Sequence, residues 1–306
     1  MQIPAVPVQP PYPEPAEPFV VVFNRRALAA RALRKSGLEE ALGDRGLPHE
    51  VQDTSSAEES YAVAQAAARA GRVVIAAGGD GTVKDVLNGI MAAGRPDAIM
   101  GHIPLGTGND IARSLGRVGE GFERALDALQ EMKVQRIDVG RVGDGEYFIN
   151  AIGVGFDGEV ARRAARMGLP TYFPAVVRTI MGYDAQSYRI AWPGGEWEGR
   201  ALMVTGMNGS YEGGGFRLAP QARLQDGLLD VYWIDPISLR QFARYVWAVR
   251  RGTHERLPMV HMWRLPRLSV ECEGALQYHV DGEYRERPPG SRLEIELEPQ
   301  RLRVIT

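Results

Sequence analysis

A carboxylate stands within a glycine-rich run at Gly78-Gly79-Asp80-Gly81-Thr82. The β-branched residues Val73, Val74 and Ile75 precede this run and favour a buried strand, and apolar residues at helical spacing follow it from Val83. A glycine turn between a strand and a helix start presents backbone N–H groups that suit an anionic phosphate. A carboxylate beside phosphates typically holds Mg²⁺. The run therefore predicts a phosphate and Mg²⁺ site, and a tight turn without a ligand is the alternative.

A second run of the same kind lies downstream, where a strand predicted over 99–104 leads into Leu105-Gly106-Thr107-Gly108-Asn109-Asp110 and a helix over 111–115. Thr107, Asn109 and Asp110 bring a hydroxyl, an amide and a carboxylate to this turn. Because parallel strands end at the same edge of a sheet, the two glycine runs are expected to face each other across a crevice. A helix start capped by Asn or Asp is the alternative.

Further carboxylates occupy predicted turns in the second half of the chain. Asp281 and Glu283 lie two residues apart in the run His279-Val280-Asp281-Gly282-Glu283, and Asp226 precedes Gly227 in another turn. A carboxylate near a phosphate can accept the proton of an attacking hydroxyl, and an Asp in a loop can hold a hard cation. Taken from the residues alone, both segments are ordinary polar turns.

Strands and helices alternate over the first half of the chain, with strands predicted over 19–23, 49–54, 73–75 and 99–104. Ser55 or Ser56 is expected to cap the second helix. Thr82 and Asp85 resemble a capping box at the start of the third helix, and Gly94 can end it. This order predicts a doubly wound, parallel α/β sheet with ligands at the carboxyl ends of its strands.

The second half changes to short strands. Hairpins are predicted between 137–142 and 147–154 and between 188–192 and 201–207, with a helix over 236–251 and strands over 259–264, 267–272, 276–280 and 292–297. This pattern predicts an antiparallel β-sandwich. A last strand near 302–305 is a candidate to return to the first domain. The run Gly153–Gly158 also matches GxGxxG, but no clear returning strand follows, so we discount it as a nucleotide site.

Composition limits the class of protein. The chain has 306 residues, enough for two domains, and its net charge of −2 gives no indication of a nucleic-acid partner. A single cysteine, Cys272, excludes an intrachain disulfide and fits a reducing compartment. No apolar run reaches the roughly 18 residues of a membrane span, and no signal peptide is apparent. Residues 1–18 hold seven of the twenty prolines and predict a disordered tail.

The string GGDGT resembles the nucleotide site shared by diacylglycerol kinases, sphingosine kinases, NAD kinases and phosphofructokinases. The second string, PLGTGNDIARSLG, narrows the resemblance to the diacylglycerol kinase catalytic domain. The resemblance implies an ATP- and Mg²⁺-dependent lipid kinase that phosphorylates diacylglycerol to phosphatidic acid. It also implies a nucleotide-binding α/β domain over 19–134 and a β-sandwich lipid-acceptor domain over 135–300, with 301–306 returning to the first.

The resemblance assigns roles to individual residues. It implies that Glu283 is the proton acceptor, with Asp281 as its helper or rival. It places a structural Mg²⁺ at Asp226 with the carbonyls of Arg223 and Leu228, and the catalytic Mg²⁺ at Asp80. The implied nucleotide contacts are Asn24, Arg25, Thr54, Gly78, Gly79, Asp80, Gly81, Thr82, Thr107, Asn109 and Asp110.

The implied partner is a lipid at a membrane surface, which makes the protein cytoplasmic and peripherally associated with the membrane; a homodimer is left open. The apolar stretch 165–183 has Arg162, Arg163, Arg166 and Arg178 on or beside it and suits contact with anionic lipid, or else packs as a buried helix. Another lipid alcohol, such as a sphingoid base or phosphatidylglycerol, is an alternative acceptor.

A catalytically inactive, lipid- or nucleotide-binding regulator is the alternative from another class. Two departures from the family pattern support it. One is Asn24-Arg25-Arg26 at the first loop, where relatives usually carry Asn-Pro and a small-residue turn. The other is Lys84-Asp85, where they usually carry Asn-Glu.

Overall fold

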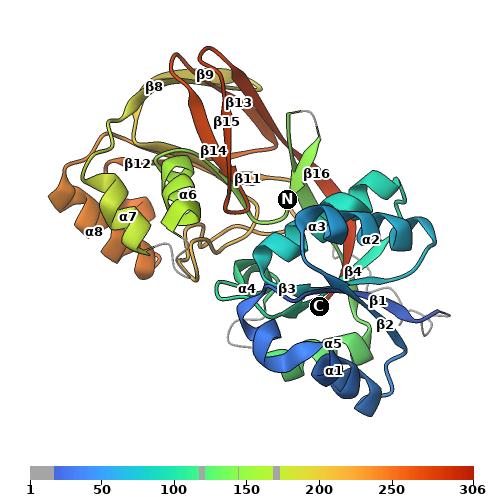
Figure 1. Ribbon diagram of the computed structural model, residues 1–306. Coiled ribbons are helices and arrows are strands. Elements are labelled where there is room, and N and C mark those ends of the chain that lie inside the picture. Colours follow the sequence, from blue (N-terminus) through green and yellow to red (C-terminus); the bar gives the residue numbers. More distant parts are fainter. Residues whose placement is uncertain (1–16, 117–120, 144, 168–172) are drawn as a thin grey trace.

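The computed structural model describes residues 17–116, 121–143, 145–167 and 173–306 (Figure 1). The prediction of a disordered tail falls mostly on residues outside these ranges. Strands and helices alternate over the first half, because apolar strand runs alternate with helical periodicity there. These elements are β1 (Phe19–Asn24), α1 (Leu28–Asp44), β2 (His49–Thr54), α2 (Ala57–Arg69), β3 (Val74–Gly78), α3 (Asp80–Ala93), β4 (Ile99–Pro104), α4 (Asp110–Ser114) and α5 (Phe122–Glu131).

Short strands dominate the second half, and α6, α7 and α8 gather on one side of it (Figure 1). Its elements are β5 (Val134–Val142), β6 (Glu146–Phe148), β7 (Ala151–Gly155), α6 (Phe156–Met167), α7 (Phe173–Ile180), β8 (Gln186–Trp192), β9 (Gly195–Ala201), β10 (Met203–Met207), β11 (Leu229–Ile234), α8 (Leu239–Arg250), β12 (Val260–Leu265), β13 (Arg267–Cys272), β14 (Leu276–Val280), β15 (Glu283–Arg287) and β16 (Arg292–Ile305).

The strands form two sheets. One follows the order β2-β1-β3-β4-β16-β13-β8-β9, with β5 paired to β16 and β6 paired to β5. Its strands β2, β1, β3 and β4 are parallel, whereas β13, β8 and β9 pair antiparallel. The other sheet is antiparallel and follows the order β12-β11-β10-β7-β14-β15. The predicted fold class, a doubly wound α/β sheet with an antiparallel β-sandwich, is confirmed.

The long strand β16 belongs to both halves of the molecule. Its first part pairs antiparallel with β13 and β5. The register against β5 shifts between Glu298 and Leu302, and Arg303 and Val304 then lie opposite Ile99 and Met100 of β4 in parallel. In Figure 1 this strand runs from the β-rich half into the α/β half. The C-terminal residues therefore extend the parallel sheet beyond β4.

The sandwich core lies between the two sheets. Apolar residues at alternate positions, such as Val270 and Ile295, pack against Val154 and Trp233 from the opposite sheet. The Trp233 ring is fully buried and stacks on Trp263 with centroids 4.0 Å apart. This packing holds β7 and β14 in place, and both strands carry residues of the site described below.

In each of the two predicted hairpins, the second strand is wrong. The hairpin partner of β5 is only the short β6, because the chain turns at Ile149 and Asn150 and enters the other sheet as β7. The partner of β8 is β9, which the prediction missed because its sequence, Gly-Glu-Trp-Glu-Gly-Arg-Ala, is mostly polar. The segment predicted as that partner, 201–207, lies mostly in β10 of the opposite sheet.

Helix ends follow their local chemistry at two of three predicted positions. Ser56 caps α2 by accepting a hydrogen bond from the Glu59 N–H, and Gly94 ends α3 with a φ of 73°. The predicted capping box of Thr82 with Asp85 is wrong. Helix α3 already begins at Asp80, after Gly79, so Thr82 lies within its first turn.

Candidate active site

The two glycine runs lie side by side at the carboxyl ends of β3 and β4. Gly78 is opposite Pro104 in the parallel register, and the Leu105 N–H donates to the Gly78 carbonyl at 2.8 Å. A Cβ added to Gly106 would lie 2.5 Å from the Gly79 Cα, closer than atoms pack. The glycines at 79 and 106 are therefore required for the contact between the two loops themselves.

Asp80 and Asp110 bring two carboxylates together beside Gly108. Asp80 Oδ1 accepts from the Ile111 N–H at 3.0 Å, and Asp110 Oδ2 accepts from the Gly214 N–H at 2.7 Å. Burial raises the pKa of Asp80, and burial together with the neighbouring Asp80 raises the pKa of Asp110 to about 7. Asp110 Oδ1 is buried without a hydrogen-bond partner in the described residues. Paired carboxylates with an unused oxygen fit Mg²⁺, which prefers oxygen ligands.

Other predicted nucleotide contacts surround these carboxylates. Asn24 donates from Nδ2 to Thr82 Oγ1 at 2.9 Å, which ties the end of β1 to α3. Asn109, with a φ of 52°, accepts from the Gly106 N–H at 3.0 Å and so shapes the second run. Thr107 is exposed next to it. Their roles in binding a nucleotide stay predictions.

Arg25 and Thr54 contact protein groups. The exposed Arg25 pairs with Asp53 at 3.4 Å. The Thr54 hydroxyl is buried and lies 3.0 Å from the Ser60 hydroxyl. Both side chains stabilise the ends of β1 and β2, and a contact of either with nucleotide stays a prediction.

Arg113 is a cation beside the second glycine run that sequence reasoning missed. Its Nε donates to the Gly108 carbonyl at 3.2 Å and lies 3.9 Å from Asp110 Oδ1. Side chains in a helix point back towards its N-terminus. An Arg in the first helical turn after a candidate phosphate-binding run was therefore the available signal, because a guanidinium can pair with phosphate oxygens.

Glu283 belongs to a network of charges that joins the two halves. The Lys84 ammonium, which is buried in α3, pairs with Glu283 and lies 3.2 Å from Glu146 of β6. Arg285 of β15 also contacts both carboxylates, at 3.3 Å and 2.8 Å. Lys84, one of the departures from the family pattern, therefore supplies the positive charge that a carboxylate at Glu283 needs.

Asp281 anchors the turn that carries Glu283. Its φ is 46°, and its carboxylate accepts hydrogen bonds of 2.9 Å from the backbone N–H groups of Ile149, Asn150 and Ala151. Burial raises its pKa to about 6 against the opposing effect of these donors. The three N–H groups use most of the acceptor capacity of the carboxylate, so its geometry favours a positioning role.

Asp226 contacts a cation of the protein. Its carboxylate pairs with Arg264 and accepts from the Leu228 N–H at 3.1 Å, while Arg264 Nε binds Asp230 Oδ1 at 2.9 Å. Asp138 holds the same loop by accepting from the Gly227 N–H at 2.7 Å. A Mg²⁺ ion at Asp226 would have to displace the Arg264 guanidinium, so this donor set does not fit the ion as arranged.

We expect Asp226→Ala to lower the melting temperature whichever cation binds here, because the loop loses its anchor. If Mg²⁺ binds, the wild-type melting temperature rises with Mg²⁺ and falls with chelator, and the variant shows neither response. Scanning calorimetry of both proteins, with Arg264→Met as the matched control, measures this. A wild-type melting temperature indifferent to Mg²⁺ and to chelator would rule out the metal and leave the ion pair.

An apolar cavity of about 170 Å³ opens beside these carboxylates. Its walls are side chains of α6, α7 and α8, including Phe156, Val160, Val176, Phe242 and Val246. Its polar end is formed by Asp80, Asp110, Asp157, Glu212, His279 and Asp281. The arrangement places a site for an apolar ligand directly against the candidate phosphate and Mg²⁺ site.

Comparison with known proteins identifies the family of both halves. Residues 18–142 match the diacylglycerol kinase catalytic domain, and residues 150–306 match the YegS C-terminal NAD kinase beta sandwich-like domain. The chain is 30% identical over 243 residues to the diacylglycerol kinase of Bacillus subtilis, covering 78% of this chain and 79% of that protein. It is 33% identical over 221 residues to a protein of Chromohalobacter salexigens named "Probable lipid kinase YegS-like", with 69% of each covered.

The fold is also found among solved structures. A structure from Bacillus anthracis str. Sterne covers 94% of this chain and 95% of its own, with a TM-score of 0.77 at 24% identity. A diacylglycerol kinase structure from the same organism has a TM-score of 0.69 at 21% identity, with 94% and 96% covered. The sequence matches over both halves show that the chain belongs to the diacylglycerol kinase family of lipid kinases.

Proposed function

We propose that the protein transfers the γ-phosphate of ATP to the hydroxyl of a lipid alcohol in the presence of Mg²⁺, with diacylglycerol as the acceptor and phosphatidic acid as the product. The observation that carries this proposal is the apolar cavity whose polar end contains Asp80 and Asp110. An acyl chain suits its walls, and the hydroxyl end of the lipid then lies at the carboxylates. The name of the Bacillus subtilis relative favours diacylglycerol among lipid alcohols.

The residues of the glycine runs position the nucleotide. Asp80 and Asp110 supply oxygen ligands for Mg²⁺, which neutralises phosphate charge when bound. Arg113 lies beside the second run and adds a cation on the same side. Because phosphoryl transfer needs alignment and charge neutralisation more than covalent chemistry, a rigid contact between the two runs is suited to it.

Glu283 takes the proton in this mechanism. Its carboxylate lies against the first turn of α3, where a Cβ added to Gly81 would be 3.5 Å from Glu283 Oε1. Lys84 and Arg285 hold the carboxylate in place. The acceptor hydroxyl gives its proton to Glu283 while its oxygen bonds to the γ-phosphorus, and ADP leaves with the bridging oxygen.

A panel of lipids tests the proposal. Purified protein with labelled ATP and Mg²⁺ should phosphorylate diacylglycerol, and chromatography should identify phosphatidic acid. If a sphingoid base or phosphatidylglycerol is labelled preferentially, the proposed acceptor is wrong but the proposed kinase reaction stands. Absence of lipid-dependent ADP formation with every lipid would contradict the kinase and favour an inactive regulator.

We propose that the exposed surface of α7 and α8 contacts a membrane and that the acceptor enters the cavity there. Met181, Leu239 and Trp247 are exposed apolar side chains on or next to these helices, with Met181 72% exposed. Within the described residues, no helix combines the length and apolar character needed to cross a bilayer. Exposed apolar residues beside arginines suit the surface of an anionic bilayer.

Only some of the predicted arginines suit this contact. Arg162 and Arg163 pair with the buried Glu159 at distances of 2.5 Å and 2.6 Å, so their charges are used within α6. Arg166 and Arg178 are exposed. The part of the stretch at 168–172, with Leu169 and Tyr172, lies outside the described residues.

We expect Arg166→Glu with Arg178→Glu to reduce binding to anionic vesicles by roughly 30-fold or more, because each basic residue near such a surface contributes about 1 kcal/mol. Vesicle co-sedimentation measures binding. Activity on vesicle substrate should fall, whereas activity on a short-chain soluble diacylglycerol should persist. Lys35→Glu with Arg69→Glu, the same charge change on α1 and α2, is the control. Equal losses on both substrates would indicate a folding or catalytic defect.

A further inference from the structure

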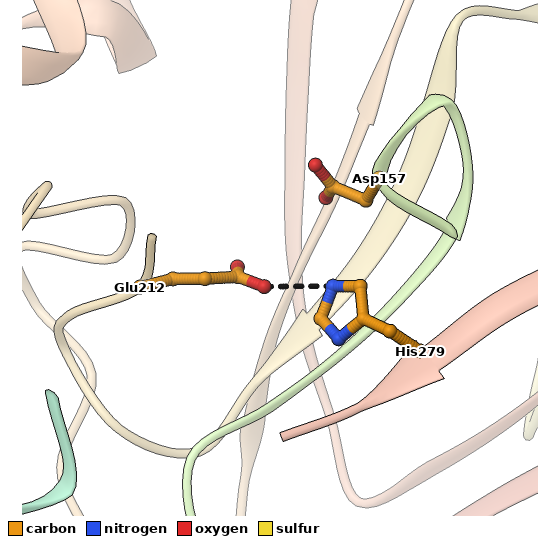
Figure 2. A group of neighbouring side chains, drawn as sticks. All are labelled: Asp157, Glu212 and His279. Atoms are coloured by element: carbon orange, nitrogen blue, oxygen red, sulfur yellow. Dashed lines mark ion pairs between the residues drawn. The ribbon is translucent and has the colours of Figure 1, made fainter. Parts of the chain in front are cut away.

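Three side chains from distant parts of the sequence meet at the polar end of the cavity. Asp157 lies in the first turn of α6, Glu212 lies between β10 and β11, and His279 is on β14. One ligand atom of each lies within 4.8 Å of the others, and all three line the cavity (Figure 2). We call them the head-group cluster. The phosphoryl-transfer mechanism above uses none of them.

His279 is fixed as a donor. Its Nδ1 accepts a hydrogen bond of 3.2 Å from the Gly282 N–H, so the proton of the neutral ring belongs on Nε2. That nitrogen lies 2.7 Å from Glu212 Oε1 and points at it in Figure 2. A metal on Nε2 would move the ring proton to Nδ1, where it would oppose the Gly282 N–H. The hydrogen bonds therefore favour a histidine that orients Glu212 over one that ligates a cation.

One acceptor atom of the head-group cluster lacks a donor. Glu212 Oε2 is buried and has no hydrogen-bond partner in the described part of the chain. Asp157 is held in place by the Thr205 hydroxyl at 2.8 Å. The described residues that line the cavity include no Lys or Arg. Buried acceptors of this kind are costly unless a ligand brings donors to them.

We propose that the head-group cluster binds a second polar group of the acceptor, a hydroxyl or an ammonium next to the hydroxyl that receives the phosphate. The preferred acceptor is then a single-chain lipid with two adjacent donors, either the diol of a monoacylglycerol or the amino alcohol of a sphingoid base. This inference rests on the proposed kinase reaction but revises its acceptor, because it ranks diacylglycerol below lipids with two donors. Diacylglycerol offers only its reacting hydroxyl and leaves Glu212 Oε2 unpaired.

The test compares kcat/KM for soluble short-chain 1-monoacylglycerol, a short-chain sphingoid base and diacylglycerol. We expect the better two-donor acceptor to exceed diacylglycerol by roughly 10- to 100-fold, the cost of leaving a buried acceptor unpaired. Which of the two is better identifies the second group as hydroxyl or ammonium. In Glu212→Gln and Asp157→Asn the preference should fall at least tenfold. Glu286→Gln, an exposed carboxylate on β15, should keep it.

Two kinetic outcomes would overturn the inference. One is a wild-type enzyme whose kcat/KM for diacylglycerol equals that for both two-donor lipids. The other is a preference for two-donor lipids that survives in folded Glu212→Gln and Asp157→Asn. Equilibrium binding of the same lipids separates this inference from the kinase function. If no lipid is phosphorylated but two-donor lipids bind and Glu212→Gln abolishes that binding, the cluster stands and the kinase proposal fails. Tight Mn²⁺ binding by calorimetry that is lost in Glu212→Gln would instead make the cluster a metal site.

Discussion

Replacing Asp80 by alanine should abolish phosphoryl transfer, with a loss in kcat of roughly 10³-fold or more, because a Mg²⁺ carboxylate ligand is worth several kcal/mol at the transition state. Asp80 and Asp110 are the paired carboxylates at the glycine runs, and Asp110 has an unused buried oxygen. Steady-state kinetics with saturating ATP and Mg²⁺ would measure the loss. Turnover within a factor of two of wild type would exclude this role.

The alanine substitution also removes a structural contact, so a matched variant is needed. Asp80 Oδ1 accepts from the Ile111 N–H, and Asp80→Asn keeps an oxygen there while it removes the charge. We expect both variants to be inactive and only Asp80→Ala to melt earlier. An active Asp80→Asn would show that the hydrogen bond, and not the charge, matters.

Glu283→Gln should lower kcat by roughly 10²–10⁴, the usual contribution of a general base, while ATP binding persists. The amide keeps the shape of the side chain but cannot take the hydroxyl proton. Nucleotide binding by fluorescence titration and turnover by a coupled assay would separate the two effects.

The charge network offers the control for this variant. Glu146→Gln removes the other carboxylate that contacts Lys84 and Arg285 but leaves Glu283 in place. Its effect on kcat should be small, because Glu283 keeps both cations. If Asp281→Asn is inactive in a folded protein while Glu283→Gln is active, the base is Asp281.

Local sequence predicted the parallel half well. The strands at 49–54 and 99–104 were predicted with the bounds that the structure gives, because residues with clear turn or capping chemistry follow each strand. The glycine runs were predicted to meet because both follow parallel strands. Their contact at Gly79 and Gly106 could not be foreseen, since it depends on how closely two loops approach.

The antiparallel half was harder because its edge strands carry little hydrophobic signal. Strand β15, with the sequence Glu-Tyr-Arg-Glu-Arg, was not predicted, and it lies at the edge of its sheet beside β14. Charged residues are common at such edges because they oppose aggregation. The turn at Asp281 was predicted, whereas its anchoring to residues 149–151 depends on a contact between distant segments.

The head-group cluster was not recognisable from the sequence. Asp157 was noted only within a discounted GxGxxG run, and His279 only as the residue that opens the predicted turn. Glu212 lies in the loop between β10 and β11, where it forms only an isolated β-bridge with Phe216. Residues so far apart meet only because β7 and β14 pair in the same sheet.

The pairing of Arg303 with Ile99 has a consequence for how the chain folds during synthesis. Strand β4 lacks its outer neighbour until residues 302–305 have left the ribosome, so the parallel sheet cannot be completed before they are synthesised. Until then β4 presents an open edge to other nascent chains, a known route to aggregation. Deletion of residues 302–305 alone would extend that exposure to the whole life of the protein. We expect the shortened protein to depend on chaperones and to become insoluble, even though its active-site residues are all present.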